Sequence, residues 1–323
     1  MKTITLGRTG ETVSRISLGT WSYGGENTSG TTSVGWAGQN DSDSVAALKK
    51  AWELGIRHWD TADVYGNGRS EKIIGTMWKF LPRRDIFLAT KVGWDRGGYS
   101  QWYHPDMMRQ HLENSLRNLQ VDEIDLYYLH HCLFESDTIL EDAIAQLHRF
   151  REEGKIRFIG LSDWDSEKIM QFIARVDPDV VQPYRSVYDD TYASSGLKQW
   201  VEDHNVGVCF FSPLKHGLLT GKYEKPVSFP EGDFRRNVPE FGDPTVITLM
   251  QENRAKLISR FSNHPQPVIH GVVDALLTDA PTGCVLLGQR NPAQVVSAAT
   301  LGTPLSETDA ARVRSLFLHR KGK

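Results

Sequence analysis

The chain has 323 residues, 39% of them hydrophobic and 24% charged, and its 37 basic and 40 acidic residues give a net charge of −3. This balance, without any block of like charge, does not support a nucleic-acid or membrane-surface partner. No apolar run approaches the roughly 20 residues of a membrane span, and the first residues lack the apolar core of a secretion signal. Length allows two domains, but one domain over residues 1–323 is expected.

The three cysteines, Cys132, Cys209 and Cys284, are odd in number and far apart along the chain. We expect buried, reduced thiols, which are typical of a cytoplasmic protein.

Short apolar segments alternate with helical patterns along the chain. A hairpin within residues 3–17 precedes a first core strand at 15–21, and a loop rich in Gly, Ser, Thr and Asn covers 22–41. The other predicted strands are 56–60, 86–91, 124–130, 156–161, 180–183, 206–212 and 284–287. The predicted helices are 42–55, 69–81, 105–119, 138–153, 166–175, 196–204, 245–262, 268–279, 292–300 and 306–318, with a polar insert over 221–243.

Eight short apolar strands separated by helices indicate parallel strands joined by right-handed crossovers. The expected fold is therefore a single α/β (β/α)8 TIM barrel, with an N-terminal β-hairpin and extra C-terminal helices. In this fold the chemistry lies at the carboxyl ends of the strands. Those ends carry mostly polar residues or glycine: Gly19, Thr20, Trp21, Asp60, Lys91, His130, Ser162, Asp163, Gln182, Phe211, Ser212 and Gly288. Any one of them could be a cap or a turn residue, but together they predict a shared site.

The stretch HWDTADVYGNGRSEKIIG, residues 58–75, reads as a strand, a loop and a helix. It places a carboxylate, Asp60, at a strand end and a phenol, Tyr65, five positions later in the following loop. The two side chains are candidates for an acid–base pair over one pocket.

Seven motifs extend this pattern: DTADVYG (60–66), TK (90–91), DLYYLH (125–130), IGLS (159–162), VVQPY (180–184), FSPLKHGLLTGKY (211–223) and LGQRNPAQ (287–294). With them the chain resembles the aldo-keto reductase superfamily over essentially its whole length, most closely the bacterial general-stress and inositol-linked branch. The resemblance implies hydride transfer between a nicotinamide cofactor and a carbonyl or alcohol. Because hydride addition leaves an alkoxide, a proton must be delivered, and Tyr65 is the expected donor.

A free phenol has a pKa near ~10, and we expect Lys91 to lower the pKa of Tyr65 toward neutral pH. Asp60 would neutralise and orient Lys91, and His130 would hydrogen-bond the substrate oxygen. An alternative is that Asp60 and Lys91 form a structural ion pair, although such buried pairs stabilise weakly.

No Rossmann fingerprint is present, since Glu71 stands where a third glycine would follow Gly66 and Gly68. The loops after the seventh and eighth strands are the expected phosphate site. Their candidate residues are Ser212, Pro213, Leu214, Gly217, Leu218, Lys222, Gly288, Gln289, Arg290 and Gln294. Arg290 precedes a helix start, with Asn291 as N-cap and Pro292 next, although this could also be a well-capped surface helix. No acidic residue lies between Gly288 and Glu307, which favours NADP over NAD.

By resemblance, Ser162, Asp163 and Gln182 would hold the nicotinamide amide, and Phe211 would stack on its ring. Gly19, Thr20, Trp21 and Asp60 would line the same site, and Arg236 would close over the phosphates. Phe210, on the opposite strand face, is expected to be core. Asp163 stands where many relatives have asparagine, and its charge would favour the oxidised cofactor, NADP⁺. Ser297-Ala298 replaces a Glu-Asn pair that recognises adenine in relatives.

Two alternative functions are weighed against this prediction. A metal-dependent hydrolase would need further strand-end histidines, and His130 and His131 would point to opposite faces, so no metal site is predicted. The alternative that stays open is a non-catalytic redox-sensing or scaffold module of the same fold, like the potassium-channel β subunits. Those subunits lack the histidine found here as His130, which favours an enzyme, and turnover of NADPH with small aldehydes would separate the two.

Trp21, Trp94, Tyr99 and Trp102 suggest an aromatic rim suited to small aldehydes, ketones, sugars or polyols. The substrate, the preferred direction and the oligomeric state are not predicted.

Overall fold

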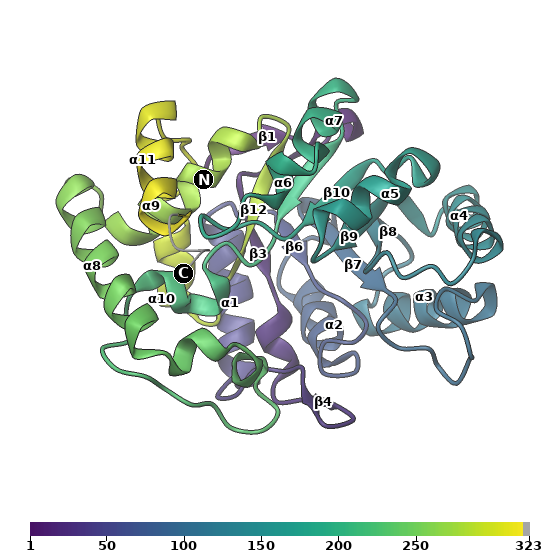
Figure 1. The fold of residues 1–323 in the computed structure, drawn as a ribbon. Coiled ribbons are helices and arrows are strands. Elements are labelled where there is room, and N and C mark those ends of the chain that lie inside the picture. Colours follow the sequence, from purple (N-terminus) through teal and green to yellow (C-terminus); the bar gives the residue numbers. More distant parts are fainter. Residues whose placement is uncertain (319–323) are drawn as a thin grey trace.

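The fold is a closed parallel barrel surrounded by helices, seen in the computed structural model, which describes residues 1–318 (Figure 1). The strands follow the order β3, β6, β7, β8, β9, β10, β11 and β12, and β12 pairs back onto β3. Their bounds are β3 Ile16–Gly19, β6 His58–Asp60, β7 Phe87–Val92, β8 Ile124–Leu129, β9 Ile156–Asp163, β10 Val180–Pro183, β11 Gly207–Phe210 and β12 Gly283–Gly288. The predicted (β/α)8 barrel is therefore confirmed.

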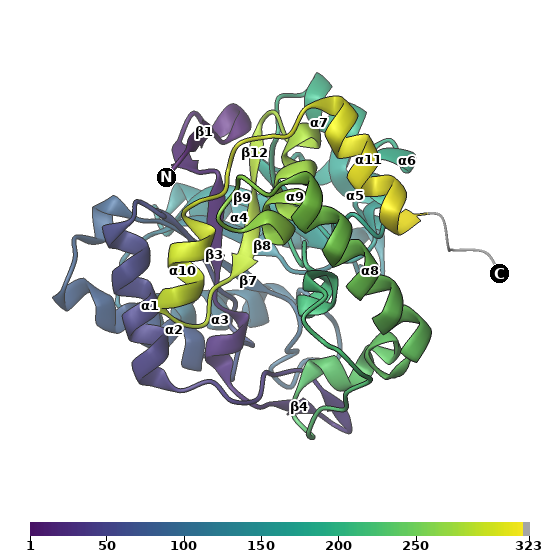
Figure 2. The same ribbon diagram turned by 90° about the vertical axis from the view of Figure 1, so that its left-hand side faces the viewer.

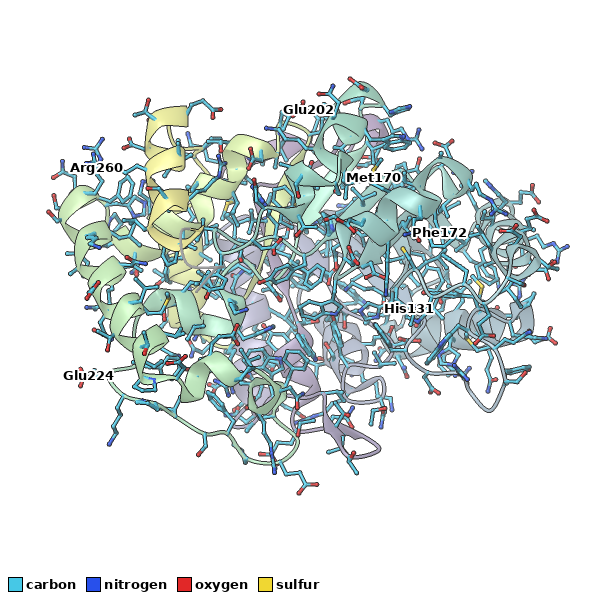
Figure 3. All side chains as sticks on the ribbon, in the orientation of Figure 1. His131, Met170, Phe172, Glu202, Glu224 and Arg260 are labelled. Atoms are coloured by element: carbon cyan, nitrogen blue, oxygen red, sulfur yellow. The ribbon has the colours of Figure 1, made fainter. Side chains whose placement is uncertain are left out.

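The helices begin where the sequence supplies caps and bury one apolar face. Asn40, Ser136 and Asn291 each accept a backbone N–H three residues on, at the starts of α1, α4 and α10. The helices are α1 Asp41–Glu53, α2 Arg69–Gly75, α3 Pro105–Leu119, α4 Asp137–Glu152, α5 Ser166–Val176, α6 Thr191–Ser194, α7 Leu197–Asp203, α8 Pro244–Arg260, α9 Pro267–Leu276, α10 Pro292–Ala298 and α11 Glu307–Leu318. Exposed charged side chains such as Glu202, Glu224 and Arg260 lie on the outside (Figure 3).

Several predicted boundaries were wrong. The helix expected over 69–81 ends at Gly75 and continues as a 3-10 turn, Thr76–Lys79. A Cβ on Gly75 would lie 2.4 Å from the Asn118 carbonyl oxygen, so this turn packs directly on the backbone of α3. Strands β8 and β11 end one and two residues earlier than expected, which places His130 and Phe211 just beyond them.

A hairpin closes the amino-terminal end of the barrel, as predicted. It pairs β1, Thr3–Thr5, with β2, Thr12–Ser14. Leu6 and Val13 from this hairpin join the apolar cluster inside the barrel. Gly7, with φ +46, sits so close to the chain that a Cβ would lie 2.2 Å from the Gly207 backbone nitrogen. The hairpin thus closes this end of the barrel, and the carboxyl end is the one open to a ligand from solvent.

The polar insert 221–243 lies near the carboxyl end, beside the loop that carries the short strands β4 (Thr28–Ser29) and β5 (Thr32–Ser33) (Figure 2). The Asn27 backbone nitrogen donates to the Gly232 carbonyl at 3.1 Å, and the Ala37 nitrogen donates to Asp233 Oδ2 at 2.9 Å. These contacts join the two loops into one rim. No helix of the described residues is both long and apolar enough to span a bilayer.

Candidate active site

A buried ion pair between Asp60 and Lys91 forms the base of the candidate site. Both side chains are about 1% exposed. Lys91 Nζ donates to Asp60 Oδ1 and to the Thr61 carbonyl at 2.7 Å. Gln182 Nε2 donates to the second carboxylate oxygen of Asp60 at 2.8 Å. Because the two charges and their hydrogen bonds satisfy one another, Lys91 is fixed in the barrel mouth.

Tyr65 lies over this pair. Its ring centroid is 5.2 Å from Lys91 Nζ, and the ring stacks on Trp21 with centroids 6.0 Å apart. The loop that carries it needs glycine at 66, where φ is +61 and a Cβ would lie 2.2 Å from the Gly24 carbonyl oxygen. The phenol and the ammonium therefore meet as the sequence predicted.

His130 completes the group, with its ring edge-on to Tyr65 at a centroid distance of 5.9 Å. Burial, Lys91 and His131 all lower the pKa of His130 well below its ordinary value. Its Nδ1 is buried and has no hydrogen-bond partner among the described residues. The side chain is consequently a neutral imidazole at the mouth, able to hydrogen-bond an oxygen without carrying charge.

The electrostatics differ from the sequence argument at Tyr65. Burial raises the pKa of Tyr65 above its ordinary value, and this outweighs the lowering by Lys91. The pKa of Lys91 is also raised. Burial alone would lower the pKa of Lys91, but the nearby Asp60 and Tyr65 raise it by more. Lys91 does lower the pKa of Tyr65, as expected, but burial sets the net direction of the shift. The pair instead consists of a protonated phenol beside a stable ammonium.

The residues predicted to hold the nicotinamide amide lie together but already bond to the protein. Ser162 Oγ donates to the Gln182 carbonyl at 2.9 Å. Asp163 accepts from the backbone nitrogens of Cys132 at 2.7 Å and Asp165 at 2.9 Å. Asp163 thus joins two loops of the rim.

Gly19 and Thr20 support the same site from β3. Thr20 Oγ1 donates to the Asp60 carbonyl at 2.9 Å and accepts from Ser70 Oγ at 2.8 Å. Thr20 is therefore a support for Asp60. Phe211 is half-buried beyond β11, whereas Phe210 is fully buried against Tyr192, as predicted.

The predicted phosphate loops are only partly brought together. Gly288 is exposed, and nothing lies within 4 Å of the position that a Cβ would occupy. Arg290 Nε donates to Gln39 Oε1 at 2.8 Å, and its Nη2 donates to the Ala37 carbonyl at 2.7 Å. Gln294 Oε1 accepts from the Arg290 backbone nitrogen at 2.8 Å. Open space at Gly288 therefore lies near the Arg290 guanidinium, whose position is fixed by its hydrogen bonds to Gln39 and Ala37.

Other residues predicted to bind the phosphates are buried in the protein or exposed to solvent. The Gln289 side chain is buried and donates to the Ser17 and Leu287 carbonyls at 3.2 and 3.3 Å. Leu218 is fully buried in the core, while Lys222 and Arg236 are exposed. The remaining members, Ser212, Pro213, Leu214 and Gly217, follow β11 in the turn where Ser212 and Gly217 have φ of +55 and +92.

Sequence reasoning missed a cation and an aromatic cluster. Burial and the nearby charge of Arg235, rather than Arg236, lower the pKa of Arg290, so two guanidinium groups share this part of the rim. Phe234 packs at the mouth against Trp21, Trp164 and His216, with ring centroids 4.9, 5.9 and 4.9 Å away. The insert has no periodicity that could have indicated either contact.

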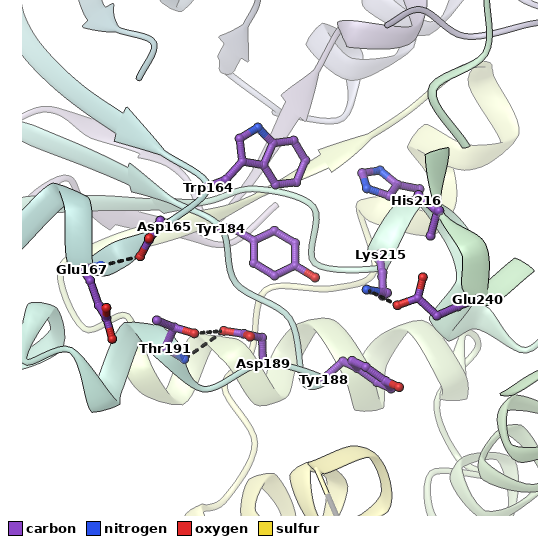
Figure 4. Close-up of a pocket in the computed structure, with 11 residues that line it drawn as sticks. Trp164, Asp165, Glu167, Tyr184, Tyr188, Asp189, Thr191, Lys215, His216 and Glu240 are labelled. Atoms are coloured by element: carbon purple, nitrogen blue, oxygen red, sulfur yellow. Dashed lines mark hydrogen bonds and ion pairs between the residues drawn. The ribbon is translucent and has the colours of Figure 1, made fainter. Parts of the chain in front are cut away.

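A pocket of about 570 Å³ opens beside this cluster, between the loops after β9, β10 and β11 (Figure 4). Trp164, Tyr184 and His216 form part of its wall, and Lys215 Nζ pairs with Glu240 at 3.0 Å across another part. Tyr184 and Trp164 also contact Phe211, with centroids 5.9 and 4.7 Å away. The pocket therefore adjoins the predicted nicotinamide platform.

The sequence model of the Aldo/keto reductase family matches residues 15–317. The chain belongs to this family. Aldo-keto reductase YhdN from Bacillus subtilis is 29% identical over 98% of the chain and 94% of its own length. An NADH-specific methylglyoxal reductase from Escherichia coli is 31% identical over 98% of both chains. Aldo-keto reductase yakc [NADP(+)] from Schizosaccharomyces pombe is 37% identical over 61% of the chain and 59% of its own length.

Solved structures agree with the family assignment. The glycerol dehydrogenase AKR11B4 from Gluconobacter oxydans has a TM-score of 0.79, with 28% identity over 97% of this chain and 94% of its own. This aldo/keto reductase is thus a member of an oxidoreductase family whose relatives differ in their named cofactors.

Asp163 offers a test of the charge in this aldo/keto reductase's mouth. The family resemblance implies that Asp163 lies beside the nicotinamide ring, where a carboxylate would favour the positively charged form. Asp163→Asn is therefore expected to weaken NADP⁺ relative to NADPH by at least about threefold. The dissociation constants of both cofactors, measured by fluorescence titration, check this. Asp165→Asn is the control, since it removes a neighbouring charge and should leave the ratio unchanged. Equal weakening of both cofactors by Asp163→Asn would refute the idea.

Proposed function

We propose that the protein is an NADP(H)-dependent oxidoreductase that interconverts an aldehyde, ketone or sugar carbonyl and its alcohol, with Tyr65 as general acid and base. The gathering of Tyr65, Lys91, Asp60 and His130 at one end of the barrel carries the proposal. A bound nicotinamide would supply or accept the hydride.

The protein's own residues would handle the proton. Since the pKa of Tyr65 is raised, the phenol is protonated at neutral pH and can donate to the oxygen of a carbonyl undergoing reduction. The phenolate left behind would be stabilised by Lys91, whose charge Asp60 maintains. A neutral His130 can donate a hydrogen bond that orients the same oxygen.

The charges of the rim suit the 2′-phosphate that distinguishes NADP from NAD. Gly288 leaves room for close approach, and Arg290 and Arg235 supply two neighbouring positive charges. Asp233 is paired with Arg235, and Asp43 accepts from Asn40 Nδ2 at 2.8 Å, so both nearby carboxylates are engaged. Asp233 and Asp43 lie near Arg290 in the fold. The absence of acidic residues between Gly288 and Glu307 in the sequence could not reveal these two neighbours. We therefore assign the proposed preference for NADP to Arg290.

Replacing Arg290 by glutamine is expected to raise the Kd of NADPH by at least about tenfold, because a charged hydrogen bond to phosphate contributes roughly 1.5–3 kcal/mol. The Kd of NADH should change less than about twofold, since NADH lacks the 2′-phosphate. Isothermal titration with both cofactors measures this. A wild-type protein that binds NADH as tightly as NADPH would contradict the assignment of NADP.

A coupled assay at 340 nm tests the function itself. Small aldehydes and sugars are offered with NADPH, and polyols and alcohols with NADP⁺, with NADH and NAD⁺ in parallel. Turnover of at least one carbonyl or alcohol class is expected. If a protein that binds cofactor turned over no compound of the panel in either direction, a non-catalytic module would replace the proposal.

A further inference from the structure

Four donor atoms gather inside the barrel, one layer below the Asp60–Lys91 pair. They are Cys209 Sγ, Cys284 Sγ, Ser17 Oγ and His58 Nδ1, from the adjacent strands β11, β12, β3 and β6. The two sulfurs are 3.1 Å apart, Ser17 Oγ is 3.2 Å from Cys284 Sγ, and it is 2.9 Å from His58 Nδ1. The cluster spans the β12–β3 seam, where the last barrel strand meets the first.

The donor spacing suits a tetrahedral thiophilic ion. With Zn–S near 2.3 Å and Zn–N near 2.05 Å, a tetrahedron needs about 3.6 Å between sulfur and nitrogen and about 3.8 Å between sulfurs. Cys284 Sγ lies 3.6 Å from His58 Nδ1, and all three ligand atoms of His58, Cys209 and Cys284 are within 4.8 Å of one another. The two sulfurs, which are 3.1 Å apart, must separate by about 0.7 Å, and Ser17 Oγ must move back from Cys284 Sγ and His58 Nδ1 to take a fourth position.

The burial of the four donor residues, and the charge that they can carry, favour a divalent ion. All four residues are fully buried, and the surrounding side chains include Leu6, Val13 and Phe87. A divalent cation with two thiolates and a neutral imidazole has no net charge, which a low-dielectric interior requires. Two thiolates and one imidazole are therefore matched to a divalent, thiophilic ion such as Zn²⁺.

We propose that His58, Cys209 and Cys284 bind a structural Zn²⁺ across the barrel seam, with Ser17 Oγ in the fourth position. Binding converts two thiols to thiolates and releases two protons to solvent. The ion links the first two barrel strands to the last two. Because the hairpin β1–β2 closes this end of the barrel, zinc loads during folding rather than by exchange into the finished protein.

The test uses the full chain, unfolded in guanidinium with reductant and refolded with excess Zn²⁺ or Cd²⁺. After desalting, wild type should retain about one metal ion per chain, measured by inductively coupled plasma mass spectrometry. The cadmium form should also show thiolate-to-metal absorption in the ultraviolet. The melting temperature should be higher after refolding with zinc than with a chelator.

The variants Cys209→Ser and Cys284→Ser should each retain less than about one tenth of an equivalent. Cys132→Ser is the matched control, because Cys132 is also buried but lies in the loop after β8, outside the cluster, and it should retain as much metal as wild type. If a serine variant fails to fold, the cadmium absorption of wild type decides alone. Wild type without retained metal, equal retention in all variants, or a Cys209–Cys284 disulfide in its place would overturn the proposal.

Discussion

Replacement of Tyr65 by phenylalanine is expected to lower kcat by at least about 10²-fold, which is roughly 3 kcal/mol of barrier. The ring keeps its stacking on Trp21, and only the proton donor beside Lys91 is lost. Steady-state kinetics with the best substrate of the coupled assay measure the effect, and the melting temperature should stay within about 2 °C because no packing is removed.

Tyr128→Phe is the matched control for this prediction. Tyr128 also has its ring within 6 Å of Lys91 Nζ, at 5.9 Å, but it lies buried below the mouth. This variant should keep kcat within about threefold of wild type, because its phenol faces the barrel interior. Near-normal turnover by Tyr65→Phe, or an equal loss in both variants, would exclude Tyr65 as the proton donor.

The second large effect is expected at Lys91. Lys91→Met removes the charge that stabilises the Tyr65 phenolate, so kcat should fall by about 10²-fold or more. It also leaves Asp60 buried with only the Gln182 hydrogen bond to its carboxylate, which should lower the free energy of unfolding by about 3–5 kcal/mol. Urea unfolding and steady-state kinetics measure the two losses.

A double variant separates stability from catalysis. Adding Asp60→Asn to Lys91→Met removes the unpaired charge, so most of the lost stability should return while kcat stays low. Recovery of activity together with stability would show that Lys91 acts only as a structural partner of Asp60.

The barrel and the gathering of Asp60, Tyr65, Lys91 and His130 at one end were predictable because the positions of strand ends depend on simple geometry. Asp60 ends β6, Lys91 lies one residue before the end of β7 and His130 lies one residue after β8, and the carboxyl ends of parallel strands converge whatever the details of packing. Tyr65 was found from its spacing to Asp60. Its raised pKa was not, because burial depends on the surrounding side chains and not on the neighbouring motif.

The rim was less predictable because loops have no period. Nothing in EGDFRRN indicates that Arg235 rather than Arg236 lies by Arg290, or that the Gln289 side chain turns inward to Ser17. Such choices depend on the path of the insert over the mouth.

The spacing of residues along the strands does indicate the thiol cluster. Ser17, His58 and Cys209 each lie two residues before the strand-end positions Gly19, Asp60 and Phe211, so the strand period of two places them one layer below the mouth. Distance along the chain concealed that Cys209 and Cys284 pair across neighbouring strands.

Transfer of deuterium from the C4 position of labelled NADPH to the carbonyl carbon of a substrate tests the central claim most directly. With NADPH that carries deuterium at both C4 positions, wild type is expected to give an alcohol with one deuterium on that carbon, detected by mass spectrometry. Tyr65→Phe should form this alcohol at least about 10²-fold more slowly. An alcohol product without deuterium, or NADPH bound tightly and never oxidised with any carbonyl, would contradict the central claim.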